Sequence, residues 1–165
     1  MHGQAVRTSP KGHAPPPEPE ASEFVEAAVS TCRERGLNLT PIRRRVLEVV
    51  GASALPVSAY AIVHQLSGSK LLGPPTVYRA LEFLEKAGFV RHLALRKAYV
   101  RCALTPDAPT SALLLCTGCG SVSEAASREM GETIGRLTAE AGFEPCGRVV
   151  EIEGRCAACR EGSGD

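Results

Sequence analysis

The chain has 165 residues, of which 44% are hydrophobic, 22% charged and 4% aromatic. This length suits one domain or two small ones, and the composition excludes a large multi-domain enzyme, a collagen-like chain and a fully disordered one. The net charge of +1 is unevenly spread: residues 1–32 carry −2, residues 33–101 carry +8 and residues 102–165 carry −5. So basic a middle segment predicts a polyanionic partner, with a solvated basic face as the alternative.

The first 21 residues are rich in proline and poor in apolar side chains, which predicts a disordered tail over 1–21. No apolar run approaches the ~18–20 residues of a membrane helix, and the tail has no apolar stretch of the secretory kind. We therefore expect a cytoplasmic protein without a membrane partner. Seven cysteines, an odd number that includes two Cys-x-x-Cys pairs, favour reduced thiolates on a metal over disulfides.

Four helices are predicted next. The first begins near Ser22 and ends at Gly36, because apolar residues recur between them at helical spacing. Thr40 is a predicted N-cap of the second helix, with proline at the first helical position, and Ser58 caps the third. Thr76 starts the fourth helix. Its outward face carries three polar side chains, namely Tyr78, Arg79 and Glu82.

Two β-like runs, 89–93 and 98–102, follow at hairpin spacing. Small helices that close on a hairpin indicate a winged helix-turn-helix domain over 22–103. Two prolines mark a hinge over 104–110, and residues 111–165 form a second domain. The expected strands there are 113–115, 122–124 and 149–152, with a helix over 127–141 between the second and third. The predicted fold class is α+β.

The two Cys-x-x-Cys pairs are the strongest signal, since together they supply four thiolates to one tetrahedral ion. The pairs are Cys116 with Cys119 and Cys156 with Cys159. Zinc suits such a set, and a shell closed by four sulfurs leaves no position for water or substrate, so the site is predicted to be structural. The alternatives are two unrelated pairs of free cysteines and a thioredoxin-like redox pair.

The fourth helix is the second signal. Tyr78 and Arg79 lie near its N-terminal end, where a recognition helix places side chains against base edges, and an arginine can bridge O6 and N7 of guanine. A plain amphipathic helix with a solvated arginine is the alternative.

Several segments together resemble the ferric uptake regulator family, in particular its zinc uptake regulator branch. They include Leu39–Arg43, Pro74–Leu81, Gly88–Val90, Cys116–Gly120 and Gly154–Cys159. The likeness covers residues 22–160 in order. It implies a homodimeric repressor that binds double-stranded DNA at inverted-repeat operators, with a winged helix, a C-terminal dimerisation domain and one structural Zn²⁺ per subunit. The residues expected to contact DNA are Tyr78, Arg79, Tyr60, Thr76, Arg43 and Arg44.

The resemblance also implies a regulatory metal site at the hinge, where this sequence departs from the family pattern. Cys102 and Glu124 align with two ligands of that site. The histidine expected after Gly88-Phe89-Val90 is Arg91 here, with His92 one place further on, and a shift of one residue in a strand turns a side chain to the opposite face. The hinge histidine is absent, which leaves Asp107 as the nearest oxygen ligand. The candidate ligands of the regulatory site are Cys102, Glu124, His92 and Asp107.

The leading hypothesis is a zinc-responsive transcriptional repressor that controls zinc uptake genes. The alternative is a repressor of the same family that answers to another metal or signal because the hinge site is altered. An enzyme is not expected, nor is a small-molecule substrate. The well-formed metal site is closed by four thiolates, and the sequence has neither a catalytic Ser/His/Asp set nor a phosphate-binding glycine loop.

Overall fold

The computed structural model describes residues 6–8, 18–67, 73–102, 111–145 and 149–161. The chain divides into two compact units. One is Gly12–Cys102, and the other combines Met1–Lys11 with Ala103–Asp165. The domains predicted from the sequence are 22–103 and 111–165, and the predicted hinge between them, 104–110, lies outside the described residues.

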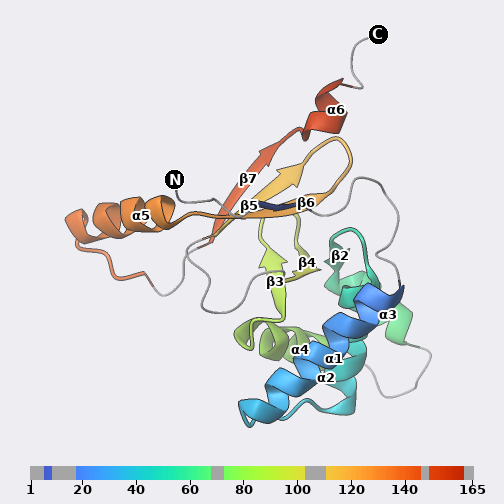
Figure 1. Cartoon of the computed structure of the whole chain (residues 1–165). Coiled ribbons are helices and arrows are strands. Elements are labelled where there is room, and N and C mark those ends of the chain that lie inside the picture. Colours follow the sequence, from blue (N-terminus) through green and yellow to red (C-terminus); the bar gives the residue numbers. More distant parts are fainter. Residues whose placement is uncertain (1–5, 9–17, 68–72, 103–110, 146–148, 162–165) are drawn as a thin grey trace. The chain divides into compact units, whose positions relative to one another are not determined.

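The unit Gly12–Cys102 has four helices and a three-stranded sheet among its described residues (Figure 1). The sheet order is β2-β4-β3, and β4 pairs antiparallel with both neighbours. The elements are α1 Glu18–Glu34, α2 Pro41–Ala52, β2 Val57–Ser58, α3 Ala59–Leu66, α4 Pro74–Lys86, β3 Val90–Leu93 and β4 Ala98–Arg101. This order of helices closing on a hairpin is the winged helix that the sequence predicts.

Local chemistry explains where these helices begin. The hydroxyls of Thr40 and Ser58 accept hydrogen bonds from backbone N–H groups of α2 and α3, as the sequence predicts for N-caps. The predicted start of α4 at Thr76 is two residues late, because Pro74 and Pro75 occupy its first turn and Gly73 is the N-cap. Prolines suit this place, since the first-turn N–H groups have no partner within the helix.

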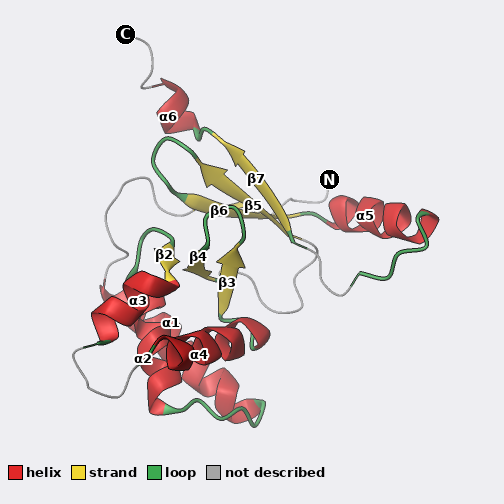
Figure 2. Cartoon of the chain, turned by 180° about the vertical axis from the view of Figure 1, so that it is seen from behind, coloured by secondary structure: helices red, strands yellow, loops and turns green. Residues whose placement is uncertain are grey.

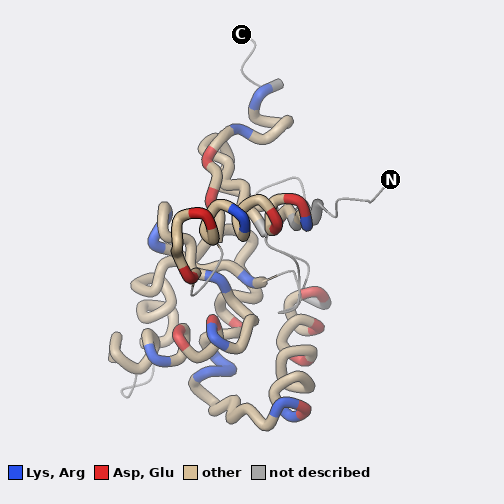
Figure 3. The backbone as a smooth tube through the Cα atoms, turned by 90° about the vertical axis from the view of Figure 1, so that its left-hand side faces the viewer, with Lys and Arg blue, Asp and Glu red and all other residues tan. Residues whose placement is uncertain are grey.

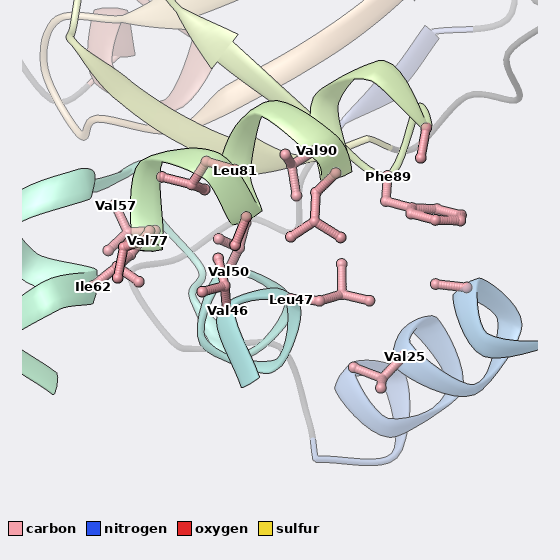
Figure 4. Packing of buried hydrophobic residues seen from close by; sticks show 14 of the residues in the cluster. Val25, Val46, Leu47, Val50, Val57, Ile62, Val77, Leu81, Phe89 and Val90 are labelled. Carbon is pink, nitrogen blue, oxygen red and sulfur yellow. The ribbon is translucent and has the colours of Figure 1, made fainter. Parts of the chain in front are cut away.

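The core of this unit is the interior between α1, α2, α3, α4 and the sheet (Figure 4). Apolar residues at helical spacing on each helix meet there, which removes them from water. Leu47 of α2, Ile62 of α3 and Leu81 of α4 are completely buried. The buried residues of α4 are Val77, Ala80, Leu81 and Leu84, on the side opposite the outward face that the sequence predicts for Tyr78, Arg79 and Glu82.

Among its described residues, the other unit contains a four-stranded sheet of order β1-β6-β5-β7 and two helices (Figure 2). Strands β1 and β6, and β5 and β6, are antiparallel, whereas β5 and β7 are parallel. The elements are β1 Val6–Thr8, β5 Ser111–Cys116, β6 Val122–Ala126, α5 Arg128–Glu140, β7 Val150–Gly154 and α6 Ala157–Glu161. The Ser127 hydroxyl caps α5, so the helix expected over 127–141 runs from Arg128 to Glu140.

The predicted disordered tail needs correction. Within 1–21, Val6–Thr8 form β1, and α1 begins at Glu18 rather than at Ser22. The strand was missed because its hydrogen-bond partners, 123–125 in β6, are far away in the sequence. Residues 1–5 and 9–17 of the predicted tail lie outside the described residues.

Candidate metal centre and nucleic-acid interface

The four cysteines of the two Cys-x-x-Cys pairs lie together at one end of the sheet of the second unit. All four sulfurs are within 4.8 Å of one another, and the Sγ atoms of Cys119 and Cys156 are 3.9 Å apart. Four sulfurs at ~2.3 Å around a tetrahedral Zn²⁺ would stand ~3.8 Å from each other. The donor set and its spacing therefore fit a zinc ion.

The parallel pairing of β5 with β7 brings the two pairs together. The register places Cys116 opposite Gly154, two residues before Cys156. Beyond the strands, the Thr117 N–H and hydroxyl both donate to the Gly154 carbonyl, at 2.7 and 3.1 Å. The second pair is thus held beside the first by backbone contacts as well as by any bound ion.

Hydrogen bonds reach two of the sulfurs. The Cys156 N–H donates to Cys116 Sγ at 3.3 Å, and the Ser121 hydroxyl lies 3.0 Å from Cys119 Sγ. The Cys156 N–H is the main reason that the pKa of Cys116 is lowered to about 5. The Ser121 hydroxyl is the main reason that the pKa of Cys119 is lowered. The contact between Ser121 and the Cys119 sulfur was not predicted from the sequence. The feature that could have indicated it is a hydroxyl side chain two positions after Cys119.

One of the other two sulfurs, that of Cys159, resists ionisation. Its neighbours Cys156, Cys116 and Cys119 raise the pKa of Cys159 to about 12. Four thiolates cannot share so small a volume without a cation, and a divalent ion supplies the missing positive charge. With all four sulfurs as ligands the shell is closed, so the chemistry of this centre is structural rather than catalytic.

The side chains of α4 that are expected to contact DNA lie on its solvent-exposed side. On α4, Tyr78 is 54% exposed and Arg79 is exposed, while Val77 and Ala80 on either side are buried. Thr76 is half-buried in the first turn. The helix therefore offers a tyrosine and an arginine to a ligand. Tyr60, at the start of α3, is 79% exposed.

The two arginines of α2 that are expected to contact DNA, Arg43 and Arg44, both have partners within the unit. Figure 3 marks the positions of Lys and Arg along the backbone in blue and those of Asp and Glu in red. The Arg43 guanidinium lies 3.6 Å from the centre of the Phe83 ring and donates to the Asn38 carbonyl. Arg44 forms ion pairs with Glu26 at 2.8 Å and Glu48 at 3.0 Å. Both ion pairs are solvent-exposed, and such pairs exchange easily for another anion.

The candidate ligands of the hinge site are divided between the two units. Cys102 and His92 belong to Gly12–Cys102, Glu124 is buried in β6 of the other unit, and Asp107 lies outside the described residues. Among the described residues, the only group of three or more His, Cys, Asp or Glu side chains close enough to share an ion is the four-cysteine cluster.

Within the β3–β4 hairpin, His92 and Cys102 lie on opposite faces. His92 is paired with Tyr99, and their ring centres are 4.9 Å apart. The Cys102 N–H donates to the Phe89 carbonyl, which continues the ladder, and Arg91 Nη2 lies 3.6 Å from Cys102 Sγ. Because side chains alternate along a strand, Arg91 shares the face of Cys102 and His92 does not. This pair of predicted ligands does not converge on one ion in this hairpin.

Helix α5 leaves apolar side chains in solvent. None of its residues is buried. Leu137 is 64% exposed, as is Phe143 just after the helix, and Ile152 of β7 is 49% exposed. Exposed apolar side chains in such number on one small unit are typical of a surface that another protein covers.

No helix in the described part of the chain has the length and apolar character needed to span a membrane.

Comparison with known proteins gives consistent matches over most of the chain. The model of the "Ferric uptake regulator family" matches residues 34–153. The zinc uptake regulation protein of Escherichia coli (strain K12) is 37% identical over 142 residues, which are 84% of this chain and 82% of that protein.

Two solved structures have the same fold. One, described as a zinc uptake regulator complexed with zinc and DNA, is 35% identical and has a TM-score of 0.81, covering 88% of this chain and 98% of its own. The other, holo XcZur, is 36% identical with a TM-score of 0.77, covering 84% of this chain and 98% of its own.

Proposed function

The chain belongs to the ferric uptake regulator family, and from this we propose that it is a zinc-responsive transcriptional repressor that controls zinc uptake genes. The observation that carries the proposal is the exposure of Tyr78 and Arg79 on α4, a helix whose opposite stripe is buried in the winged-helix core. The similarity to a zinc uptake regulator solved with zinc and DNA supports it. The family's members are transcription regulators, so no catalytic activity is proposed.

Recognition of DNA is assigned to one surface of the unit Gly12–Cys102. Tyr78 and Arg79 contact base edges in the major groove, and Tyr60 and Thr76 contact the backbone nearby. Arg43 and Arg44 contact DNA phosphates. To do so, Arg44 gives up its ion pair with Glu26 or Glu48 and pairs with a phosphate oxygen instead. The basic segment 33–101 supplies the long-range attraction to the polyanion.

The protein acts as a homodimer. The exposed apolar residues Leu137 and Phe143 give the second unit a surface suited to a second copy of itself. A two-fold symmetric dimer carries two recognition helices, so its operator is an inverted repeat. Its DNA target places it in the bacterial cytoplasm.

Two zinc ions per subunit are proposed. The structural ion is held by Cys116, Cys119, Cys156 and Cys159, whose spacing fits it. The regulatory ion takes Cys102 and Glu124, with Asp107 as a third ligand. His92 is on the wrong face of its hairpin to join Cys102 without a change of register. That misfit favours the second candidate function, a family repressor that answers to another metal or signal.

The decisive experiment measures zinc per subunit and affinity for an inverted-repeat duplex, first with Zn²⁺ added and then after a mild chelator. Two ions with chelator-sensitive binding support the zinc-responsive repressor. One chelator-resistant ion with chelator-insensitive DNA binding would contradict it in favour of the second candidate. No binding to any such duplex would overturn both.

A further inference from the structure

We propose that Arg35 positions the recognition helix α4 from its C-terminal end, and that it thereby controls how well the protein distinguishes its operator from other DNA. This inference rests on the proposed function, in which Tyr78 and Arg79 of α4 contact base edges. It gives one arginine of the basic segment 33–101 a role other than binding phosphate.

Arg35 links the end of α1 to the end of α4. Its Nη1 atom donates to the Ala87 carbonyl at 2.8 Å, across 52 positions of sequence. Ala87 is the C-cap of α4 and is buried. The last carbonyls of a helix have no partner within the helix, and they form the negative end of its dipole. The guanidinium therefore satisfies one of these acceptors and places its positive charge where the helix favours a cation.

The backbone around Arg35 is well defined. Gly36, the next residue, has a φ of 63°, and the Leu37 N–H donates to the Cys32 carbonyl at 2.8 Å, which closes the end of α1. The Cys32 side chain is part of the hydrophobic core of the unit. The Arg35 side chain thus extends from a closed turn that is anchored in the core, and it can fix the end of α4 relative to α1.

A second arginine contacts the same half of α4. Arg43, in the first turn of α2, has its guanidinium 3.6 Å from the centre of the Phe83 ring, one helical turn before Ala87. Arg43 and Phe83 are both half-buried, and a cation–π contact is stronger where water is partly excluded. The chain from Arg35 to Arg43 therefore makes two cationic contacts with the C-terminal half of α4, besides the apolar packing of the helix.

The residues that contact bases lie toward the other end of α4. Arg79 and Ala87 are eight positions apart, or about 12 Å along the helix axis. A tilt of about 5° about Ala87 would therefore move Arg79 by roughly 1 Å. Specific contacts have to stay within about 0.5 Å of their productive geometry, whereas phosphate contacts carry no sequence information. Loss of the Arg35 contact should thus reduce affinity for the operator more than affinity for DNA in general.

The test measures the affinity of the full-length protein for an inverted-repeat operator and for a duplex of unrelated sequence, over a range of salt concentrations. Arg35→Gln removes the charge and shortens the side chain. Because one hydrogen bond is lost, the ratio of the two affinities is expected to fall by about three- to tenfold, with the salt dependence unchanged. A lost phosphate contact would instead weaken binding to both duplexes alike and reduce the salt slope by about one.

Two further variants separate the contact from the charge. Arg35→Lys can still bring a charged donor to the Ala87 carbonyl, so it is expected to restore part of the ratio. Arg33→Gln removes an exposed arginine from the last turn of α1, two residues away, and is the matched control. Arg35 is itself exposed, so its substitution is expected to leave the unit folded, which urea unfolding checks.

Amide hydrogen exchange without DNA gives a measurement that does not depend on the operator. The amides of α4 near Ala87 should exchange faster in Arg35→Gln than in the native chain or in Arg33→Gln, because the end of the helix opens more easily. Equal exchange rates there in all three proteins would overturn the inference. So would an unchanged affinity ratio in Arg35→Gln, an equal fall in Arg33→Gln, or a salt slope reduced by about one. If the native chain shows no preference for the inverted repeat, the proposed function fails instead, and the exchange comparison still decides whether Arg35 positions α4.

Discussion

Gly118 lies directly against Cys159 in the four-cysteine cluster: a Cβ atom at position 118 would stand 2.9 Å from Cys159 Sγ and 3.0 Å from its Cβ. Real Cβ atoms do not come so close, so any side chain there displaces a ligand. Gly118→Ala is expected to weaken the structural zinc by about tenfold or more. Chelator competition on the purified protein measures this loss.

The control for that variant is Gly154→Ala, because a Cβ at position 154 meets no atom within 4 Å. Gly154 lies in the same zinc-bearing region, on β7. If both variants release zinc equally easily, the close approach at Gly118 is not what positions Cys159.

Arg79→Ala is expected to lower affinity for the operator by about tenfold to a hundredfold, since a bidentate arginine–guanine contact contributes that much discrimination. The loss of affinity should be far smaller for a duplex of unrelated sequence, because it comes from a base-specific contact and not from the charge of the arginine. Fluorescence anisotropy with both duplexes makes the comparison. Arg136→Ala, which removes an exposed arginine of α5 paired with Glu140, serves as the control; a similar loss there would show that overall charge explains the effect.

Zinc affinity of the four-cysteine cluster should fall as the pH falls. Bound zinc requires thiolates, and the pKa of Cys159 is raised to about 12, so at pH 6–8 at least one proton must leave when zinc enters. Cys116, with its pKa lowered to about 5, is already ionised in that range. The expected slope is about a tenfold loss of affinity, or more, for each pH unit of acidification. Chelator competition between pH 6 and 8 tests it, and a flat profile would contradict the charge distribution described for the cluster.

Leu137→Glu is expected to shift the protein from dimer toward monomer. The substitution places a carboxylate on an apolar surface of α5. Burying that surface in a dimer would then require the carboxylate to lose its hydration, which is costly. Sedimentation equilibrium measures the dissociation constant, which should rise by at least tenfold. Ala139→Glu adds the same charge at an exposed position about 200° around the same helix. Equal effects of the two variants would place the dimer surface elsewhere.

Leu47→Ala should destabilise the unit Gly12–Cys102 by about 2–5 kcal/mol, because the side chain is completely buried and leaves a cavity. Urea unfolding followed by circular dichroism measures the change. Leu95→Ala, in the exposed turn after β3, is expected to change stability by less than about 0.5 kcal/mol.

Sequence alone predicts the features that local chemistry decides. The caps at Thr40 and Ser58 were found because a hydroxyl and the N–H three residues later lie in one turn of chain. The four clustered cysteines were found because their Cys-x-x-Cys spacing itself encodes the geometry of a metal site. That the side chains of Arg91 and His92 lie on opposite faces also follows from strand alternation, and their pairing with Val100 and Tyr99 agrees with it.

What sequence could not predict depends on partners distant in the chain. The two-residue strand Val57–Ser58 exists because Tyr99 and Ala98 lie beside it. The contact of Arg91 with Cys102 depends on the hairpin register, and the pairing of Arg44 with Glu26 depends on how α1 packs on α2. None of these has a periodic signal of its own, since short segments acquire structure from tertiary contacts.

The parallel pairing of β5 with β7 also determines when the four-cysteine centre can form during protein synthesis. Cys116 and Cys119 leave the ribosome some forty residues before Cys156 and Cys159, and no chain shorter than that can complete the tetrahedral centre. The winged-helix unit, whose described core lies entirely upstream, has by then been free to fold. Metal insertion is therefore a late step in maturation. In zinc deficiency, a newly made chain would fold its winged-helix unit before any metal ion links β5 to β7.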